Sequence, residues 1–435
     1  MAGFLLGGRR RRAAFIASRA GCGFPVRSRH DMDLKSGYPF WAVKNGLMHT
    51  FPPLAADLDV DVAIIGGGIT GALVAHELAS HGHAVAVIDQ RDIGWGSTAA
   101  STALLQYEID THMVDLAKRH GEADALLAYR ACAEAIDMAA ALAKDVGDVD
   151  FARMSSLYYA SKRGHRRDLE DEFALRARHG FEVEWLEPGA IRERYGFDAP
   201  AAILSAKAAR IDPYRMAYRL LARLEKSGSA VHDRTVITRI QAGPRDVALE
   251  TATGHRIRAK WLVMAAGYAT QQFLHRSVGA NRSSYAFITD PIDPGLLGPL
   301  RQTMVWESAR PYLYLRTTGD GRLLVGGEDD AVDIPARRDA QVDRKAHKLA
   351  RQVAGLFPHL PVAPAFAWAG TFAETADGLP WFGASDEHGP RVLFAMAYGG
   401  NGITYSMLGA GLLRALIERR RHPLARLFSF ARDAG

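Results

Sequence analysis

Cysteine and long apolar runs are scarce in this sequence. Its only two cysteines, Cys22 and Cys132, lie far apart along the chain. Two thiols cannot build a disulfide framework or a four-ligand zinc site, so a reducing compartment, the cytoplasm by default, is expected. No run of 18 apolar residues occurs, which argues against a membrane-spanning helix. These absences exclude a disulfide-stapled scaffold and direct attention to ordinary globular chemistry.

Acidic residues are absent from the first 30 positions, which hold seven arginines and no lysine. The whole chain has 54 basic and 48 acidic residues, a net charge of +6, so this segment accounts for the entire positive excess. The rest is close to neutral and gives no global attraction to nucleic acid, and no aromatic residues interleave with Arg9–Arg12. The segment is an organelle transit peptide, a tail without fixed structure, or sequence upstream of a true start at Met32. The sequence leaves these three readings open.

The composition of the 435 residues is that of a soluble globular protein, with 48% hydrophobic and 23% charged residues. This length suggests two or three domains with a large buried core. Helices are expected near residues 111–145, 166–179, 214–226 and 340–356, and regular structure is expected to begin near Val60. A hairpin is expected where residues 312–316 and 323–326 flank a turn at 319–321.

A glycine-rich turn between a strand and a helix is the strongest local signal. Residues 60–65 form a β-branched run typical of a buried parallel strand, and a helical pattern follows to His81. Between them lies Gly66-x-Gly68-x-x-Gly71, where glycines permit the tight turn, the approach of backbone to a pyrophosphate, and close helix–strand packing. Asp89 closes the next strand, roughly 20 residues later, where a carboxylate accepts hydrogen bonds from ribose hydroxyls. Together these features predict a dinucleotide site.

Three further segments bear on which dinucleotide binds. The loop Gly96–Thr102 is rich in small hydroxyl side chains, residues 262–267 resemble a strand ending in a tight turn, and residues 397–404 form a glycine turn that opens a helix. The N-terminus of that helix places N–H groups where they favour an electron-rich ligand edge. Each turn taken singly also fits simple chain reversal, whereas their joint order favours a long ligand such as FAD.

These segments resemble the D-amino-acid-oxidase-like family of FAD-dependent oxidoreductases, which includes glycine, sarcosine and γ-glutamylputrescine oxidases. The resemblance runs from about Asp59 to about Arg420 and also includes residues 325–328 and 377–380. It implies FAD held without a covalent bond, since no cysteine lies near 399–404 and no histidine lies in the Gly96–Thr102 loop. The implied FAD contacts are Gly66, Gly68, Ile69, Thr70, Gly71, Asp89, Gln90, Ser97, Thr98, Val236 (through its backbone), Ala266, Gly267, Gly400, Asn401, Gly402, Ile403 and Thr404.

The same resemblance implies an α/β fold in which a three-layer, Rossmann-like FAD-binding domain is interleaved with a substrate domain built on a mixed or antiparallel sheet. Residues 1–58 would be a leader and N-terminal extension. The FAD-binding domain would comprise 59–110, 205–270 and 370–420, and the substrate or cap domain 111–204 and 271–369.

In this family the C–H bond next to the substrate nitrogen gives a hydride to the flavin, and the resulting imine is hydrolysed in water. The protein positions the carbon and keeps the amine neutral, so no base is required. Strand alternation places Tyr312, Tyr314 and Arg316 on one face, which is either the substrate side of the flavin or a solvent-facing surface.

The stretch 369–375 carries no arginine, although relatives that oxidise amino acids commonly have one just before the Asp-Gly-x-Pro segment, where it grips a carboxylate. An α-carboxylate would then need Arg310 or Arg316. Glu374 favours a cationic amine instead, unless it is an ordinary surface carboxylate.

Two other sequence features, considered as functional motifs, give no support for a further site. His76 and His81 flank a Glu77-containing segment, but at i and i+5 they point roughly 140° apart on a helix, so no metal site is predicted. No second strand–glycine–helix fingerprint appears, which disfavours a reductase that binds NAD(P)H.

The leading hypothesis is oxidation of an amine or amino acid, with oxygen or another electron acceptor and no nucleic-acid partner. The alternatives are a dehydrogenase of a hydroxylated substrate that passes electrons to a quinone or carrier protein, and a non-catalytic flavin-binding subunit.

Overall fold

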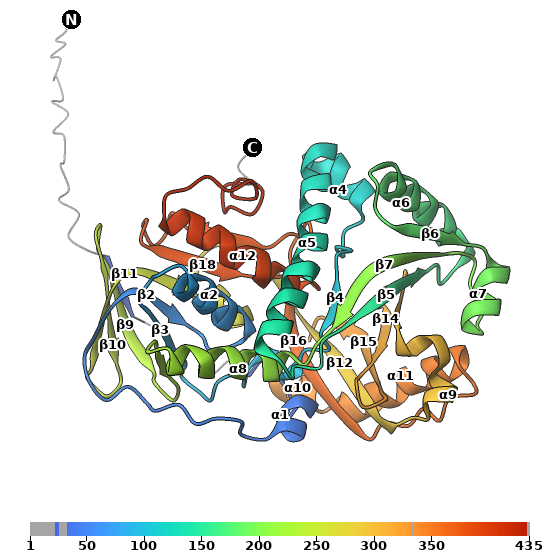
Figure 1. Ribbon diagram of the computed structural model, residues 1–435, viewed down its shortest axis with the longest axis horizontal. Coiled ribbons are helices and arrows are strands. Elements are labelled where there is room, and N and C mark those ends of the chain that lie inside the picture. The colour runs from blue at the N-terminus through green and yellow to red at the C-terminus, as the bar shows by residue number, and fades with distance from the viewer. Residues whose placement is uncertain (1–21, 26–32, 333, 433–435) are drawn as a thin grey trace, which may run out of the picture.

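The computed structural model describes residues 22–25, for which only the backbone is described, together with 33–332 and 334–432. Two large mixed sheets lie next to each other, each with its own helices (Figure 1). The arginine-rich run Arg9–Arg12, and with it the choice between a transit peptide, a tail and a start at Met32, lies outside the described residues. No helix in the described part of the chain is long and apolar enough to span a membrane.

The first sheet contains the predicted βαβ unit. Its strand order is β1-β9-β10-β11-β2-β3-β8, and β18 pairs with β11 and with β17. The strands β2, β3, β8, β11 and β18 run parallel, whereas β1, β9 and β10 add an antiparallel ribbon. The bounds are β1 Cys22–Pro25, β2 Leu58–Ile65, β3 Val85–Ile88, β8 Ala230–His232, β9 Ile237–Ala242, β10 Val247–Thr251, β11 Arg256–Met264, β17 Trp381–Ala384 and β18 Val392–Met396.

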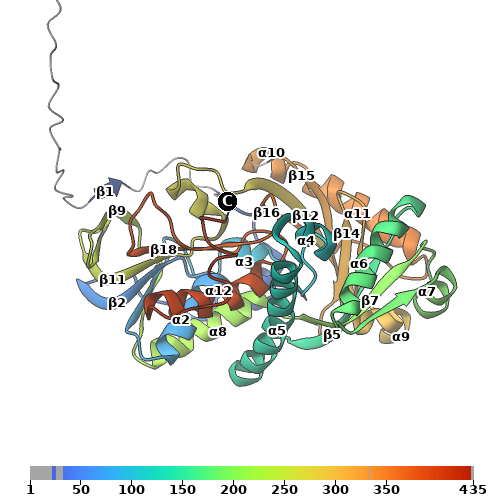
Figure 2. The same cartoon turned by 90° about the horizontal axis from the view of Figure 1, so that it is seen from above.

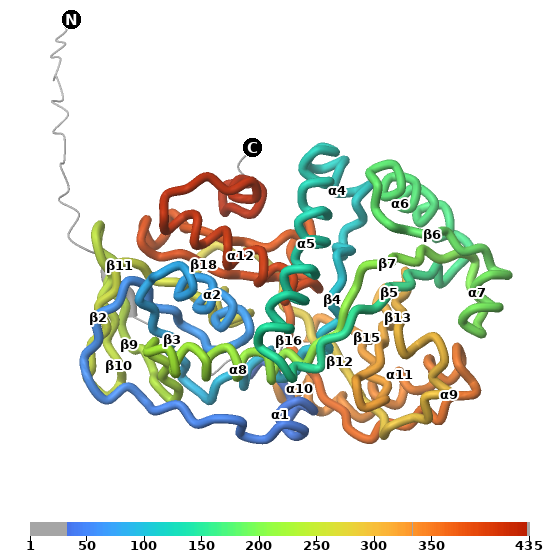
Figure 3. The backbone as a smooth tube through the Cα atoms, viewed as in Figure 1, coloured from blue at the N-terminus to red at the C-terminus, as the bar shows by residue number. Residues whose placement is uncertain are grey.

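Helix α2 (Ile69–Ser80) packs against both α8 (Pro213–Lys226) and α12 (Gly402–Ile417) beside the parallel strands. Helices α2 and α12 lie side by side although they come from opposite ends of the chain (Figure 3). Helix α8, expected near 214–226, begins at Pro213, and the Asp212 carboxylate caps it by accepting a 2.9 Å hydrogen bond from the Arg215 N–H.

The second sheet has the order β16-β12-β15-β14-β13-β5-β7-β4, with β6 beside β7. All its pairs are antiparallel except β13 with β5, and the predicted hairpin is β14–β15. Helix α11 (Val342–Leu356) covers part of one face (Figure 2). The bounds are β4 Leu104–Gln106, β5 Ala152–Tyr159, β6 Val183–Leu186, β7 Ala202–Arg210, β12 Ala280–Pro291, β13 Thr303–Glu307, β14 Leu313–Thr317, β15 Arg322–Asp330 and β16 Phe366–Glu374.

The expected combination of a Rossmann-like unit and a mixed-sheet unit is confirmed, but the sheets divide the chain at other positions than the sequence suggested. Strand β7 lies partly, and β16 mostly, inside segments expected to bind FAD, yet both belong to the second sheet. Conversely α5 (Glu122–Val146), expected in the cap, packs against α8 and α12 of the first unit. Its buried face is mostly alanine, which allows helices to approach closely.

The expectation that regular structure begins near Val60 is wrong. Helix α1 (Phe40–Asn45) precedes it, and the side chains of Trp41 and Phe51 are completely buried. The indole N–H of Trp41 donates to the carbonyl of Ser101 at 2.7 Å, next to the predicted FAD loop. A single short helix has too few residues to show a hydrophobic period, so the sequence pattern did not indicate that this segment belongs to the core.

The remaining helices connect these elements. They are α3 Ser97–Ala100, α4 Met113–His120, α6 Arg166–Arg178, α7 Pro188–Tyr195, α9 Pro294–Leu297 and α10 Pro335–Asp339, with 3₁₀ turns at Arg163–His165, Gly267–Phe273 and Gly298–Arg301.

Candidate active site

The glycine turn between β2 and α2 has the geometry that its sequence requires. Gly66 has φ +114, and a Cβ there would lie 2.3 Å from the carbonyl oxygen of Ala265. A Cβ on Gly71 would lie 1.8 Å from the carbonyl oxygen of Gly66. Both positions therefore exclude any side chain, and their emptiness lets α2 start directly beside β2 and β11.

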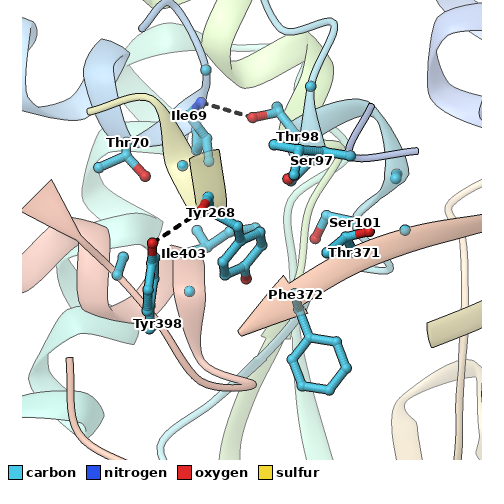
Figure 4. A pocket seen from close by; sticks show the side chains of 18 of the residues that line it. Ile69, Thr70, Ser97, Thr98, Ser101, Tyr268, Thr371, Phe372, Tyr398 and Ile403 are labelled. Carbon is cyan, nitrogen blue, oxygen red and sulfur yellow. Dashed lines mark hydrogen bonds between the residues drawn. The ribbon is translucent and has the colours of Figure 1, made fainter. Parts of the chain in front are cut away.

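The first N–H groups of this turn are held by side chains from neighbouring segments. The Gly67 N–H donates to the Asp89 carboxylate at 2.7 Å, and the Ile69 N–H donates to the Thr98 hydroxyl at 2.9 Å (Figure 4). Thr70 and Ser406 share a 2.8 Å hydrogen bond that ties α2 to α12. The turn is thus fixed in place by residues of α3, β3 and α12.

Asp89 lies at the end of β3, where the sequence placed it. Its second oxygen accepts a 2.9 Å hydrogen bond from the Arg91 N–H, and burial raises the pKa of the carboxyl group. Gln90, Thr235 and Ile237 line the cavity beside it. Val236, between the last two, is not part of the lining: its side chain is exposed and its carbonyl accepts from the Ala252 N–H at 2.9 Å.

One cavity runs from this turn to the second sheet. Most predicted FAD contacts line it, whereas Gly71, Val236 and Thr404 do not. The lining includes Gly66, Gly68, Ile69, Thr70, Asp89, Gln90, Ser97, Thr98, Ala266, Gly267, Gly400, Asn401, Gly402 and Ile403. The sequence therefore identified segments that the fold brings together around a single space.

The C-terminal glycine turn is anchored to the segment that follows β4. The Asn401 amide donates to the carbonyls of Gln106 and Glu108 at 3.1 and 2.8 Å, and the Gly400 N–H donates to the Asp110 carboxylate at 2.9 Å. Thr404 acts in the same way, since its hydroxyl donates to the Gln106 carbonyl at 3.3 Å. Thr404 thus fixes the N-terminus of α12 without facing the cavity.

The far end of the cavity is aromatic. Tyr312 and Tyr314 line it with ring centroids 5.5 Å apart, and Trp306 stacks on Tyr158 at 3.8 Å. The Tyr314 hydroxyl shares a 3.2 Å hydrogen bond with Ser284, and burial raises the pKa of Tyr314 to about 12. Both tyrosines are therefore neutral hydroxyl groups at physiological pH.

Arg316 is a correction to the hypothesis that it faces the substrate. Its side chain is completely buried and does not line the cavity. The guanidinium donates to three backbone carbonyls, those of Thr102 at 2.7 Å, Ile211 at 3.0 Å and Thr317 at 3.2 Å. Alternation along the strand predicts which residues share a face of the sheet. It does not predict which other segments pack against that face, and here the guanidinium binds carbonyls of those segments.

Glu374 is the second correction. Its carboxylate lies outside the cavity lining, is 45% exposed, and pairs with the Arg282 guanidinium at 2.9 Å. The alternative interpretation of Glu374, an ordinary surface carboxylate, therefore fits the structure.

Several lining residues escaped sequence reasoning: Glu108, Asp110, Tyr268, Ser284, Trp306, Asp329 and Phe372. A signal existed for two of them, because Gln106, the last residue of β4, Glu108 and Asp110 occupy alternate positions and all three line the cavity. Asp329 lies in the acidic run 328–330 at the end of the predicted hairpin, where a charge run is usually a solvated face.

The cavity fits a dinucleotide on its own chemistry. The Ser97 hydroxyl is buried, lines the cavity and has no hydrogen-bond partner among the described residues. Such an orphan is expected where a ligand completes the bond. FAD requires three features that are present here: a glycine turn with no room for a Cβ, an acidic residue at the end of the second strand, and a hydroxyl free to bond to the ligand.

Comparison with known proteins agrees. The family model described as FAD dependent oxidoreductase matches residues 61–416. The chain belongs to this family, which confirms the resemblance, and FAD is its cofactor.

Individual relatives support the same assignment. The chain is 29% identical to glycine oxidase of Geobacillus kaustophilus (strain HTA426) over 372 residues, covering 83% of this chain and 93% of that protein. It is 26% identical to gamma-glutamylputrescine oxidoreductase of Escherichia coli (strain K12) over 391 residues, covering 87% and 88%. The crystal structure of the Geobacillus glycine oxidase superposes with a TM-score of 0.72 at 21% identity, covering 86% of this chain and 99% of that chain.

Proposed function

We propose that this protein oxidises a C–N bond of an amine or amino acid, using FAD held without a covalent bond. The observation that carries the proposal is the single cavity that joins the glycine turn at Gly66 to the aromatic end at Tyr312 and Tyr314. A substrate at that end would lie in the same space as the cofactor. The names of the similar proteins, glycine oxidase and gamma-glutamylputrescine oxidoreductase, support this class of donor.

The chain's own residues would bind and orient the substrate, while FAD, when bound, supplies the acceptor for a hydride. The walls formed by Trp306, Tyr312 and Tyr314 exclude water and restrict the amine to a few orientations. The imine product would be released and hydrolysed in water. Cysteine and histidine are both absent from the lining residues in the described part of the chain, which supports non-covalent attachment.

The test is anaerobic reduction of the flavin by a panel of amines, amino acids and hydroxy acids. Bleaching by an amine or amino acid supports the proposal, and peroxide release on admission of air identifies oxygen as the acceptor. Bleaching by hydroxy acids alone, with slow reoxidation, would instead favour a dehydrogenase. A flavin that no compound reduces would favour a non-catalytic subunit. Denaturation should release FAD into solution; flavin that stays with the precipitated chain would contradict non-covalent binding.

A further inference from the structure

Carboxylates gather at the aromatic end of the cavity. Glu108 and Asp110 approach from the segment after β4, and Asp329 from the end of β15. We call these three residues the acidic end. Among the described lining residues the only cationic side chain is Arg91, which belongs to the opposite end, where its N–H binds Asp89. The two ends of the cavity therefore differ in charge.

Asp329 is the carboxylate with the least compensation. Its Oδ1 atom is buried and has no hydrogen-bond partner among the described residues. Burial raises the pKa of Asp329 to about 7; a hydrogen bond from Ser284 and the charge of Arg310 oppose this shift, and the charges of Asp110 and Glu374 reinforce it. A buried carboxylate oxygen without a partner is costly, so the site is incomplete as the chain alone builds it.

Glu108 adds a second orphan atom. Its side chain is 3% exposed, and its Oε1 accepts from the Ser205 hydroxyl at 2.6 Å and faces the Arg176 guanidinium at 3.7 Å. Its Oε2 is buried and finds no partner among the described residues. Two unpartnered carboxylate oxygens in one cavity point to a ligand that donates hydrogen bonds and carries positive charge.

Arginines near this end do not present a site for an anion. The Arg310 guanidinium lies 4.3 Å from the centre of the Tyr312 ring and donates to the Asp110 carbonyl at 3.2 Å, outside the lining. Arg316 is fully used by three carbonyls. On β16, the residues that line the cavity include Thr371 and Phe372, which are uncharged (Figure 4).

We infer that the acidic end first binds the ammonium form of an amine that has no carboxylate beside its reactive C–N bond, before the nitrogen releases its proton to water and becomes the neutral amine that is oxidised, and that Asp329 is the residue that determines this specificity. The inference rests on the proposed function and narrows its substrate class. A carboxylate placed here would meet like charges in a poorly solvated space, whereas an ammonium group would complete the orphan oxygens.

The sign of the pH dependence follows from the groups that face Asp329, namely Asp110, Arg310, Glu374, Tyr312 and Tyr314. A bound cation stabilises the ionised carboxylate and lowers its pKa, so binding expels a proton wherever the free protein holds Asp329 protonated. Affinity for a cation should therefore fall by up to tenfold per pH unit below about 7. Above pH 7 it should level off until the amine itself loses its proton at about 10.

Two probes of one shape and opposite charge test the inference on the FAD-loaded protein. tert-Butylammonium has no C–H bond next to nitrogen and cannot be oxidised, and pivalate replaces its ammonium with a carboxylate. Their dissociation constants are measured at pH 6, 7 and 8 by calorimetry and by perturbation of the flavin spectrum. We expect the cation to bind at least tenfold more tightly than the anion, and to weaken from pH 7 to pH 6.

Asp329→Asn should weaken tert-butylammonium binding at least tenfold at pH 8 and remove the pH dependence. The matched control is Glu374→Gln, a carboxylate outside the lining, which should leave the affinity at pH 8 unchanged and, because its charge helps to raise the pKa of Asp329, should shift the loss of binding to lower pH. Pivalate binding as tight as that of the cation, or Asp329→Asn binding the cation like the parent protein, would overturn the inference. If Asp329→Asn does not fold, the probe pair and its pH profile on the parent protein still decide.

These outcomes separate the inference from the proposed function. Flavin bleaching by α-amino acids together with tight pivalate binding would sink the inference and keep the function. Tight, pH-dependent binding of the cation with no bleaching by any amine or amino acid would keep the cation site and contradict the proposed function.

Discussion

The two ends of the cavity are built in opposite ways. At the dinucleotide end, Gly66, Gly68 and Asp89 come from one βαβ unit, so neighbours in space are also neighbours in sequence. At the acidic end, Asp110 follows β4 in the first third of the chain and Asp329 is the second-to-last residue of β15 in the last third. These carboxylates meet in one cavity although β15 and β4 are not neighbours in the second sheet.

This difference separates what is general in the protein from what is particular to it. The dinucleotide end is held by backbone geometry, where a single added Cβ meets main-chain atoms. At the acidic end, side chains set the charge of the site. Substituting one of them changes that charge without moving the backbone. Substitutions at the first end should therefore abolish cofactor binding, and substitutions at the second should alter which substrate is accepted.

Gly68→Val should have the largest effect, which is complete loss of FAD. A Cβ at this position would lie 2.9 Å from the Thr98 hydroxyl that receives the Ile69 N–H, and the branched side chain would fill the approach to the turn. The purified variant should lack flavin absorbance. Gly355→Ala is the control, because a Cβ there meets nothing within 4 Å. A yellow Gly68→Val protein would contradict the assignment of this end.

Arg316→Met should come next, as a loss of stability. The change would leave the carbonyls of Thr102, Ile211 and Thr317 without their buried donor, at a cost of about 3 kcal/mol. The melting temperature of the FAD-loaded protein should fall, while KM for the best amine of the panel stays the same. A higher KM at unchanged melting temperature would return Arg316 to the substrate site.

The contrast between the ends also explains how much the sequence predicted. The βαβ unit, the C-terminal glycine turn and the hairpin were all predicted because each is a local pattern with its own turn chemistry. Arg316 was misplaced because alternation along a strand says which residues share a face and not what covers that face. For Glu374 the sequence left a substrate contact and a surface carboxylate open, since nothing local indicates its exposure. Asp329 was missed because the groups around it, Asp110, Ser284 and Glu374, come from separate segments that no local pattern links to it.

Tyr314→Phe tests the aromatic wall on its own. The substitution keeps the ring and removes the hydroxyl that pairs with Ser284 at 3.2 Å. Loss of this internal hydrogen bond should lower the free energy of unfolding by about 1 kcal/mol. A hydroxyl that also contacts the substrate adds a roughly tenfold fall in kcat/KM for amines, with FAD content unchanged. Tyr38→Phe, at a ring that is 67% exposed, is the control. Unchanged kcat/KM would mean that the hydroxyl plays no part in positioning the substrate.

Glu374→Gln should have the smallest effect and sharpens the comparison most directly, since Glu374 and Asp329 are both carboxylates on neighbouring parts of the second sheet. The Glu374–Arg282 pair is 45% and 37% exposed on its two sides. Water and salt screen such a pair, so its loss should change the free energy of unfolding by about 0.5 kcal/mol or less. Measured with the same amines, Glu374→Gln should keep the parent kcat/KM where Asp329→Asn loses it. Equal losses in both variants would show that negative charge anywhere on this side of the sheet attracts the substrate, and that burial at Asp329 adds no selectivity.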